Sequence, residues 1–274
     1  MLNELYQNLD PIAFSLGPLV VRWYGLAYVL GFAVAAFIVY RVAKRWRIAL
    51  DEDALITVMV CAIVGIVLGA RLGYVLFYGD GYYLAHPLEI LAFNQGGMSF
   101  HGGLIGVLVG GLVAAKLTGI PFLTLADLGA IAAPIGLFFG RCANFVNGEL
   151  WGAPTDLPWG VVFGGAAGTM PRHPSQLYEA LLEGLVIFLV LYLLSRKVPP
   201  RPRGTFLGAF LVLYGVFRFL IEFVREPDVQ LGYLWGGWLT MGQLLSVPVL
   251  LAGVALLVWA AKKKLPQEGM DPRE

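Results

Sequence analysis

The chain has 274 residues, 58 % of them apolar and only 14 % charged, with a net charge of +1 at pH 7. Soluble domains carry about 25 % charged residues, so this composition excludes a soluble globular protein and predicts a polytopic membrane protein. The small net charge gives no reason to expect a nucleic-acid partner. The two cysteines, Cys61 and Cys142, fit neither a metal-ligand spacing nor a disulfide framework.

Seven apolar stretches are long enough to cross a bilayer, for which a helix needs about 20 mostly apolar residues. In chain order they cover roughly residues 19–40, 54–78, 99–117, 122–142, 176–195, 205–224 and 238–261. The predicted fold is therefore all-α, a single integral membrane domain over residues 1–274 with seven transmembrane helices. The longest connection, residues 143–175, is rich in glycine, proline and tryptophan.

Basic residues predict the orientation of these helices, because cytoplasmic loops carry an excess of lysine and arginine. Such residues follow the first, third, fifth and seventh helices: Arg41, Lys44, Arg45, Arg47, Lys116, Arg196, Lys197, Arg201, Arg203, Lys262, Lys263, Lys264 and Arg273. All of these positions lie on one side of the membrane. We therefore expect the amino terminus outside and the carboxyl terminus in the cytoplasm.

The remaining basic residues are all arginines, and each falls in the outer half of a helix or in an outer connection. They are Arg22, Arg71, Arg141, Arg172, Arg218 and Arg225. Arginine presents a planar fork of donors that suits phosphate oxygens, and charges inside a membrane are costly and usually functional. The pattern predicts an anion site, most simply for phosphate, that faces the outer leaflet.

Histidine 101 marks the outer start of the third predicted helix, where Ser99 is placed to cap the helix. Glycines repeat every four residues on this helix (Gly102, Gly106, Gly110) and on the second helix (Gly65, Gly69, Gly73), a spacing that lets membrane helices pack closely. His101 itself has two readings. It is a proton acceptor beside the arginines, or a polar helix-end residue bonded to the backbone.

The stretch from Arg141 to Gly152, GRCANFVNGELWG when read from Gly140, closes an apolar run with polar side chains. Arg141 and Asn144 are three residues apart and share one face of a helix. Gly148 is expected to end that helix and to leave Glu149 on a turn. Glu149 either forms a structural ion pair with an arginine or is a carboxylate whose protonation matters near the anion.

Two later stretches also carry polar groups. Pro174, at the start of the fifth helix, is typical of a helix entry, and His173 beside it is a candidate head-group contact. Arg218, Glu222 and Arg225 form one stripe on the sixth helix. The stripe is either a structural ion network or, because two arginines face one glutamate, a source of spare positive charge with Arg225 as the ligand contact.

Five stretches together resemble the prolipoprotein diacylglyceryl transferase family: Trp23–Gly25, His101–Gly106, Arg141–Gly152, Arg172–Glu179 and Arg225–Asp228. The resemblance covers essentially the whole chain. It implies a bacterial inner-membrane enzyme with seven helices and an outward-facing active site. It further implies transfer of a diacylglyceryl group from phosphatidylglycerol to the lipobox cysteine of a prolipoprotein signal peptide, with loss of glycerol phosphate and formation of a thioether, the first step of lipoprotein maturation.

With this chemistry, the four catalytic candidates are His101, Arg141, Glu149 and Arg225. Arg141 is expected to bind the phosphate and Arg225 to stabilise the leaving charge, while His101 or Glu149 accepts the thiol proton. The substrate-binding candidates are Arg141, Tyr24, Asn144, Asn147, Gly152, Arg218, Glu222, His173 and Gln176. The chemistry requires no metal and no cofactor, so neither is expected.

Two other functions compete with this one. A transporter or flippase for an anionic lipid would also explain intramembrane arginines, although transporters often show internal repeats and this sequence shows none. A head-group transferase with a water or alcohol acceptor would commonly carry a metal-binding acidic cluster, and the sequence offers no such cluster.

Overall fold

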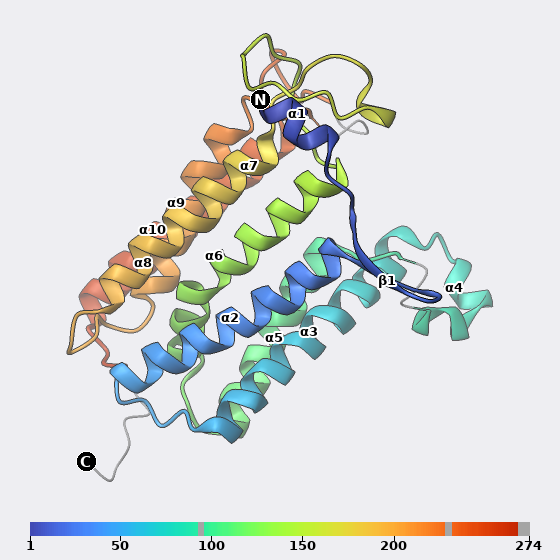
Figure 1. The fold of residues 1–274 in the computed structure, drawn as a ribbon. Coiled ribbons are helices and arrows are strands. Elements are labelled where there is room, and N and C mark those ends of the chain that lie inside the picture. Colours follow the sequence, from blue (N-terminus) through green and yellow to red (C-terminus); the bar gives the residue numbers. More distant parts are fainter. Residues whose placement is uncertain (93–95, 228–231, 268–274) are drawn as a thin grey trace. The chain divides into compact units, whose positions relative to one another are not determined.

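The computed structural model describes residues 1–92, 96–227 and 232–267, and it is mostly helical (Figure 1). Asp228, in the last of the five stretches above, and Arg273, one of the basic residues used for orientation, lie outside the described residues. The chain forms two compact units, residues 1–42 with 127–266, and residues 43–126 with the described Gln267.

The first unit opens with a short helix and a hairpin that lead into the first long helix. These elements are α1 (Leu2–Gln7), β1 (Ile12–Leu16), β2 (Leu19–Arg22) and α2 (Trp23–Arg45). The strands pair antiparallel, with Gly17 at positive φ in the turn between them. The predicted start of the first helix at residue 19 is therefore wrong, as is a purely α fold, because the Leu19–Arg22 segment is β-branched at Val20 and Val21 and extends as a strand.

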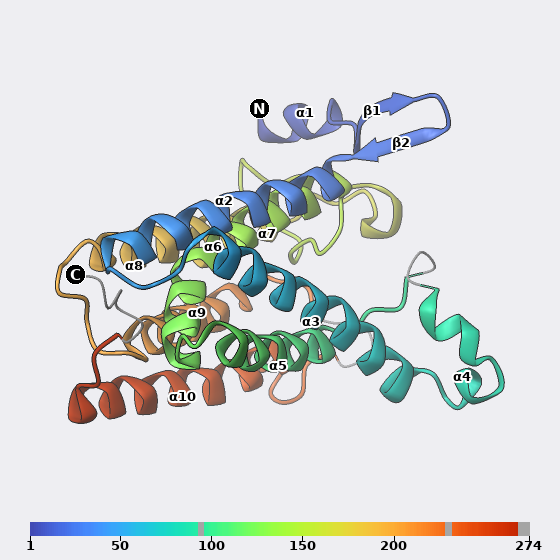
Figure 2. The same ribbon diagram turned by 90° about the horizontal axis from the view of Figure 1, so that it is seen from below.

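The helices that follow in this unit are α6 (Phe122–Asn147), α7 (Ser175–Glu179), α8 (Ile187–Ser195), α9 (Thr205–Ile221) and α10 (Met241–Lys263). A π-helical segment, η4 (Ala180–Val186), joins α7 to α8 in one continuous run. Helix α9 packs against α10 and also contacts α8, and the three helices can be followed in Figure 1. Figure 2 gives the same elements from below.

Buried polar groups fix where two of these helices begin. The Asp127 carboxylate of α6 accepts hydrogen bonds from the backbone N–H groups of Gly204 and Leu207 at 2.7 and 2.8 Å, and so caps the start of α9. Thr240 and Gln243 form a reciprocal capping box at the start of α10. The second of these caps lies beside the polar residues described below, because Thr240 also bonds to Glu222 at the far end of α9.

The second unit is built on a pair of long helices, α3 (Glu52–Tyr78) and α5 (Phe100–Thr118). Between them lie α4 (Tyr82–Ala85) and the 3₁₀ turn η1 (Pro87–Leu91), next to the end of α3 in Figure 2. Ser99 caps α5 by accepting a hydrogen bond from Gly102, as predicted.

The glycine repeats of α3 and α5 face each other, which confirms their predicted packing role. A Cβ atom on Gly106 would collide with the backbone of Gly65 and Gly69, and one on Gly102 would collide with Gly69 and Gly73. The two helices therefore approach backbone to backbone, an arrangement that only glycine permits.

Six helical segments of the described chain are long and apolar enough to cross a membrane: Trp23–Arg45, Glu52–Tyr78, Phe100–Thr118, Phe122–Asn147, Ser175–Ser195 and Met241–Lys263. A shorter apolar helix, Thr205–Ile221, occupies most of the predicted sixth span at 205–224. The predicted fourth helix ended five residues early, because α6 continues from 142 through Asn147. Large apolar side chains such as Leu76, Phe77 and Leu117 are exposed along these helices, as expected for surfaces in contact with lipid.

Replacing Gly106 with alanine is expected to destabilise the second unit by about 1–3 kcal/mol, because the new methyl group must push α3 and α5 apart. Gly129→Ala in α6 is the matched control, since nothing lies within 4 Å of its added Cβ and alanine is the better helix former. Thermal unfolding of both variants in detergent is the measurement. An unfolding temperature for Gly106→Ala equal to that of the wild type would show that α3 and α5 do not pack as described.

Candidate active site

Three elements of the first unit bring arginines and carboxylates together in its interior. Arg141 lies near the end of α6, and Glu179 ends α7 just before η4. Arg218 is in the last turn of α9. We call the group the arginine–carboxylate cluster, and its members are Arg141, Glu179, Glu183, Arg218, Glu222 and Arg225.

Glu179 is the centre of this cluster, and its side chain is fully buried. Its Oε2 atom lies 2.7 Å from Arg141 Nη2 and 3.2 Å from Arg218 Nη1, while its Oε1 atom lies 3.3 Å from Arg225 Nη1. One carboxylate therefore holds three guanidinium groups that come from α6, from α9 and from the segment after α9. Charged groups buried in this way are stable only when several ion pairs and hydrogen bonds compensate the loss of water.

Glu222 forms the second anchor. Its Oε1 atom pairs with Arg218 Nη2 and lies 3.3 Å from Arg225 Nε, and its Oε2 atom accepts a hydrogen bond from Thr240 Oγ1 at 2.6 Å. Gly242 leaves the space that this carboxylate fills, since a Cβ there would collide with it. The predicted stripe of Arg218, Glu222 and Arg225 therefore exists as an ion network. The predicted excess of two arginines over one glutamate was wrong, because Glu179 pairs with both Arg218 and Arg225.

Glu183 is the exception within the cluster. It is fully buried on η4, and neither carboxylate oxygen accepts a hydrogen bond from the described residues. Its nearest cationic atom is Arg218 Nη1, at 4.0 Å from its Oε1. Neither Glu179 nor Glu183 is among the site residues predicted from the sequence. Two glutamates four residues apart in an apolar run are the signal that would have found them.

Glu149 stands on the turn that the sequence predicts. Helix α6 ends at Asn147, and Gly148 and Leu150 both take positive φ on either side of Glu149. Asn144 and Asn147 donate through Nδ2 to Glu149 Oε1, at 2.7 and 3.3 Å. In the described part of the chain Glu149 makes no ion pair, so its carboxylate is positioned by amides.

Gln176 ties this turn to the start of α7. Its Nε2 atom donates to the Glu149 carbonyl oxygen at 2.7 Å, and the side chain is fully buried. Gln176 Oε1 and Asn147 Oδ1 are buried acceptors with no hydrogen-bond partner among the described residues. The turn thus holds two amide oxygens that have unused capacity to accept hydrogen bonds.

Tyr24 joins the turn to the cluster. Its hydroxyl lies 3.1 Å from the Tyr28 hydroxyl in the first turns of α2, near enough to Glu149 and Arg141 to be influenced by their charges. Arg141 is one helical turn from Asn144, which holds Glu149. Arg141 therefore belongs to both polar groups, the cluster and the Glu149 turn.

Main-chain hydrogen bonds hold the long connection in place. This connection was predicted to cover residues 143–175, and in the structure it begins after Asn147. Gly152 N–H donates to the His173 carbonyl at 2.9 Å, and Ala153 N–H donates to the Val224 carbonyl at 3.0 Å. Gly152 also forms an isolated β-bridge with Arg225. The segment that carries Glu149 is thereby fastened to the segment that carries Arg225.

His173 and Arg172 have protein partners in this connection. Burial lowers the pKa of the His173 imidazole, so the ring is neutral at pH 7, and its Nδ1 atom lies 3.3 Å from the Tyr178 hydroxyl. Arg172 Nη1 pairs with Glu226 at 2.8 Å and donates to the Gly152 carbonyl at 3.2 Å. The Arg172 guanidinium therefore stabilises the fold of the connection.

Arg71 and His101 lie in the second unit. The Arg71 guanidinium is buried and donates to the backbone carbonyls of Glu89, Ile90, Gly96 and Gly97, so protein acceptors occupy it. Of the six outer arginines, Arg71 and Arg172 thus have structural roles. His101 is exposed in the first turn of α5, with its ring against Phe100.

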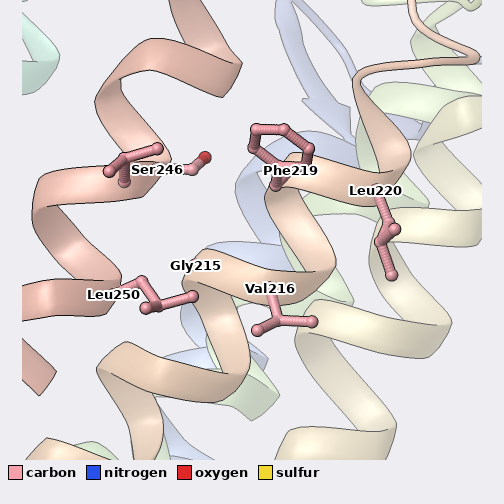
Figure 3. Close-up of a pocket in the computed structure, with 7 residues that line it drawn as sticks. Gly215, Val216, Phe219, Leu220, Ser246 and Leu250 are labelled. Atoms are coloured by element: carbon pink, nitrogen blue, oxygen red, sulfur yellow. The ribbon is translucent and has the colours of Figure 1, made fainter. Parts of the chain in front are cut away.

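An apolar pocket of about 140 Å³ lies between α9 and α10. Figure 3 shows Gly215, Val216 and Phe219 on one helix and Ser246 and Leu250 on the other. Val216 and Phe219 precede and follow Arg218 closely along α9. The pocket offers walls for hydrocarbon next to the cluster, and it brings no charged group of its own.

Comparison with known proteins gives a consistent result. Residues 11–259 match the protein family described as prolipoprotein diacylglyceryl transferase. A phosphatidylglycerol–prolipoprotein diacylglyceryl transferase from Geobacter sulfurreducens is 52 % identical over 260 residues, covering 95 % of this chain and 98 % of the relative. Enzymes of the same name from Aliivibrio salmonicida and Pseudomonas paraeruginosa are each 48 % identical, covering 95 % and 96 % of this chain and 90 % and 97 % of the relatives.

Gly152→Ala is expected to loosen the connection, because the added Cβ would lie 2.6 Å from His173 Cβ and 2.8 Å from the His173 carbonyl oxygen. The strain should cost about 1–3 kcal/mol and speed proteolytic cleavage between residues 148 and 174. Ala166→Ser, at an exposed position of the same connection, is the control. Limited proteolysis followed by mass spectrometry makes the comparison, and equal cleavage of the two variants would contradict the backbone clamp.

Proposed function

The chain belongs to the prolipoprotein diacylglyceryl transferase family, and we propose that it transfers the diacylglyceryl group of phosphatidylglycerol to the lipobox cysteine of a prolipoprotein. This reaction is the first step of bacterial lipoprotein maturation. The substrates are the membrane lipid and the signal peptide that carries the cysteine. The enzyme is a multi-pass membrane transferase.

The observation that carries this proposal beyond family membership is the position of Arg141. Its side chain contributes Nη2 to Glu179 and retains further N–H donors of its fork, and it is 18 % exposed, the most exposed arginine of the cluster. Arg141 is therefore assigned to the lipid phosphate. Arg225 donates from Nη1 to Glu179, and its Nε atom lies 3.3 Å from Glu222 Oε1 without a hydrogen bond. We assign it to stabilise the charge that develops as the phosphate leaves.

The reaction balances without a co-reactant. The cysteine thiol loses its proton, and its sulfur forms a bond to the terminal glycerol carbon of the diacylglyceryl group. The bond between that carbon and the phosphate oxygen breaks, and glycerol phosphate departs with the electron pair. Because a free thiol has a pKa of about 8.5, the enzyme must supply a base or a positive field to form the thiolate.

His101 is assigned as the general base, with Glu149 orienting or sharing the proton. Imidazole exchanges protons near neutral pH, which suits a thiol donor. Asn144 and Asn147 hold the Glu149 carboxylate in place. Asn144 and Asn147, together with Tyr24 and Gln176, position the polar head groups of the substrates. Arg218 and Glu222 keep the other charged groups of the cluster in place. Gly152 and His173 hold the connection against it.

The topology that goes with this function has seven spans. Thr205–Ile221 would be about 26 Å long as an ideal helix, near the lower limit for a membrane span. Counting it as the sixth span puts the amino terminus outside and the carboxyl terminus in the cytoplasm by the distribution of basic residues. We place the protein in the bacterial inner membrane, as one integral membrane domain, with its active site toward the outer face.

A direct assay separates this function from its main rival, a carrier for an anionic lipid. The purified protein is mixed in detergent with phosphatidylglycerol and a lipobox peptide, and both peptide mass and released glycerol phosphate are followed. A peptide heavier by one diacylglyceryl group, with stoichiometric glycerol phosphate, is the expected result. Folded protein that binds the lipid but yields no adduct would favour the carrier.

Arg141→Ala is expected to lower kcat/KM for phosphatidylglycerol about 10²–10³-fold, the effect of removing a preorganised donor from a developing anion. Arg141→Lys keeps the charge but loses the fork, so its loss should be intermediate. Arg41→Ala, an exposed arginine near the end of α2, is the control and should behave as the wild type does. Normal turnover by a correctly folded Arg141→Ala protein would remove the phosphate assignment.

The base assignment is tested with His101→Gln and Glu149→Gln. Loss of a general base lowers kcat about 10²–10⁴-fold, and His101→Gln should also abolish the fall in kcat at acid pH. Glu149→Gln should keep the shape of the wild-type pH profile at a lower rate, because it disturbs orientation. The assay is kcat against pH with saturating lipid and peptide. A His101→Gln profile that runs parallel to the wild type would transfer the role to Glu149.

A further inference from the structure

Glu183 has no place in the reaction as described so far, although it lies within the arginine–carboxylate cluster. It is fully buried, and both of its oxygens lack hydrogen-bond partners among the described residues. An ionised carboxylate in such a position costs several kcal/mol unless it is paired and hydrogen-bonded. Glu183 is therefore the carboxylate of the cluster whose charge is least supported, and the first to be neutralised when further negative charge enters.

The other carboxylates of the cluster are in a different situation. Glu179 contacts three guanidinium groups, and Glu222 contacts two and also accepts a hydrogen bond from Thr240. Glu183 has only Arg218, at 4.0 Å. If one carboxyl group of the cluster carries a proton, it is therefore Glu183.

Local backbone geometry holds Glu183 in this position. It lies in the π-helical segment η4, four residues after Glu179, and Gly184 beside it packs directly against Phe138 of α6. Like charges four residues apart repel on a helix, and π-helical turns are concentrated at functional sites. The segment therefore holds the Glu183 carboxyl group close to Glu179, where few cations or hydrogen-bond donors stabilise a second negative charge.

Charge counting shows when the proton matters. The cluster contains three guanidinium and three carboxyl groups, so with all of them ionised its net charge is zero. A bound phosphodiester would then leave one uncompensated negative charge in a buried site. One proton taken up together with the phosphodiester restores a net charge of zero, and Glu183 is the carboxylate with the fewest partners to compete for that proton.

We propose that Glu183 takes up a proton when the phosphate of the donor lipid enters the arginine–carboxylate cluster and holds it while the anion is bound. Glu183 is a positioning residue that acts on the anion through Arg218. The groups that face it come from each neighbouring element: Glu179 of α7, Arg141 of α6, Tyr214 and Arg218 of α9, and Arg225 beyond α9. This inference rests on the proposed function, because it takes the lipid phosphate as the anion.

The first test is the pH dependence of lipid binding. Affinity of the purified protein for dioctanoyl phosphatidylglycerol is measured between pH 7 and pH 9 without peptide, so that no acceptor thiol titrates. Since the protonated form binds the anion, wild-type affinity should fall as pH rises, by up to about tenfold per unit. Glu183→Gln, which is permanently neutral, should lose this slope. Glu226→Gln, outside the cluster, is the matched control and should keep it.

Infrared difference spectroscopy detects the protonation itself, a signal that a purely structural role of Glu183 would not produce. Lipid binding to the wild type should produce the carbonyl band of a protonated carboxylic acid, absent in Glu183→Gln and retained in Glu226→Gln. If Glu183→Gln does not fold, Glu183→Asp keeps a carboxyl group and should shift the band. Equal pH slopes in wild type and Glu183→Gln, or a band unaffected by both Glu183 variants, would overturn the inference.

The transfer assay on the same preparations separates the two proposals. Wild-type protein that transfers diacylglycerol but shows no linked proton refutes the role of Glu183 alone. Protein that binds the lipid with proton uptake yet makes no adduct refutes the transferase and leaves the role of Glu183 intact. Binding of dioctanoylglycerol, which lacks the phosphate, should be independent of Glu183.

Discussion

Burial of the Glu179 carboxylate among three arginines is the interaction on which the rest of the first unit depends. The three guanidinium groups come from α6, α9 and the segment beyond α9, so a single fully buried side chain ties these elements together. Removing either side of such a pair would strand a charge away from water, which costs far more than the pair contributes. The cluster therefore specifies one arrangement of these elements, and it fixes the directions in which the arginines can donate.

Main-chain hydrogen bonds extend this arrangement to the turn that carries Glu149. Gly152 is bonded to His173 and bridged to Arg225, so the connection after α6 cannot move independently of the cluster. Gly152 serves here because a side chain would occupy the space of the His173 backbone. The Glu149 carboxylate and the arginines of the cluster are thus tied to one backbone framework.

In the proposed reaction, the balance of charge in the cluster links lipid binding to the chemical step. Arginines that bind a lipid phosphate need counterions while the site is empty, and these counterions must not outweigh the arginines once the anion has entered. Two strongly paired carboxylates, Glu179 and Glu222, together with one weakly paired carboxyl group, Glu183, meet both conditions. Protonation of a buried acid is a less costly way to adjust the charge than movement of a helix.

The sequence by itself determined the membrane class, the position of most spans, the Ser99 cap, the turn at Glu149 and the packing of the glycine repeats. Each of these follows from hydropathy or from the spacing of residues within one segment, such as the four-residue glycine repeat on each helix, which local patterns encode. Only the tertiary structure decided the partners of the charges. Glu179 and Arg225 are far apart in sequence, and nothing local distinguishes an arginine that pairs with a carboxylate from Arg71, which donates to backbone carbonyls. The hairpin before α2 was missed because its apolar second strand reads as the first turn of a span.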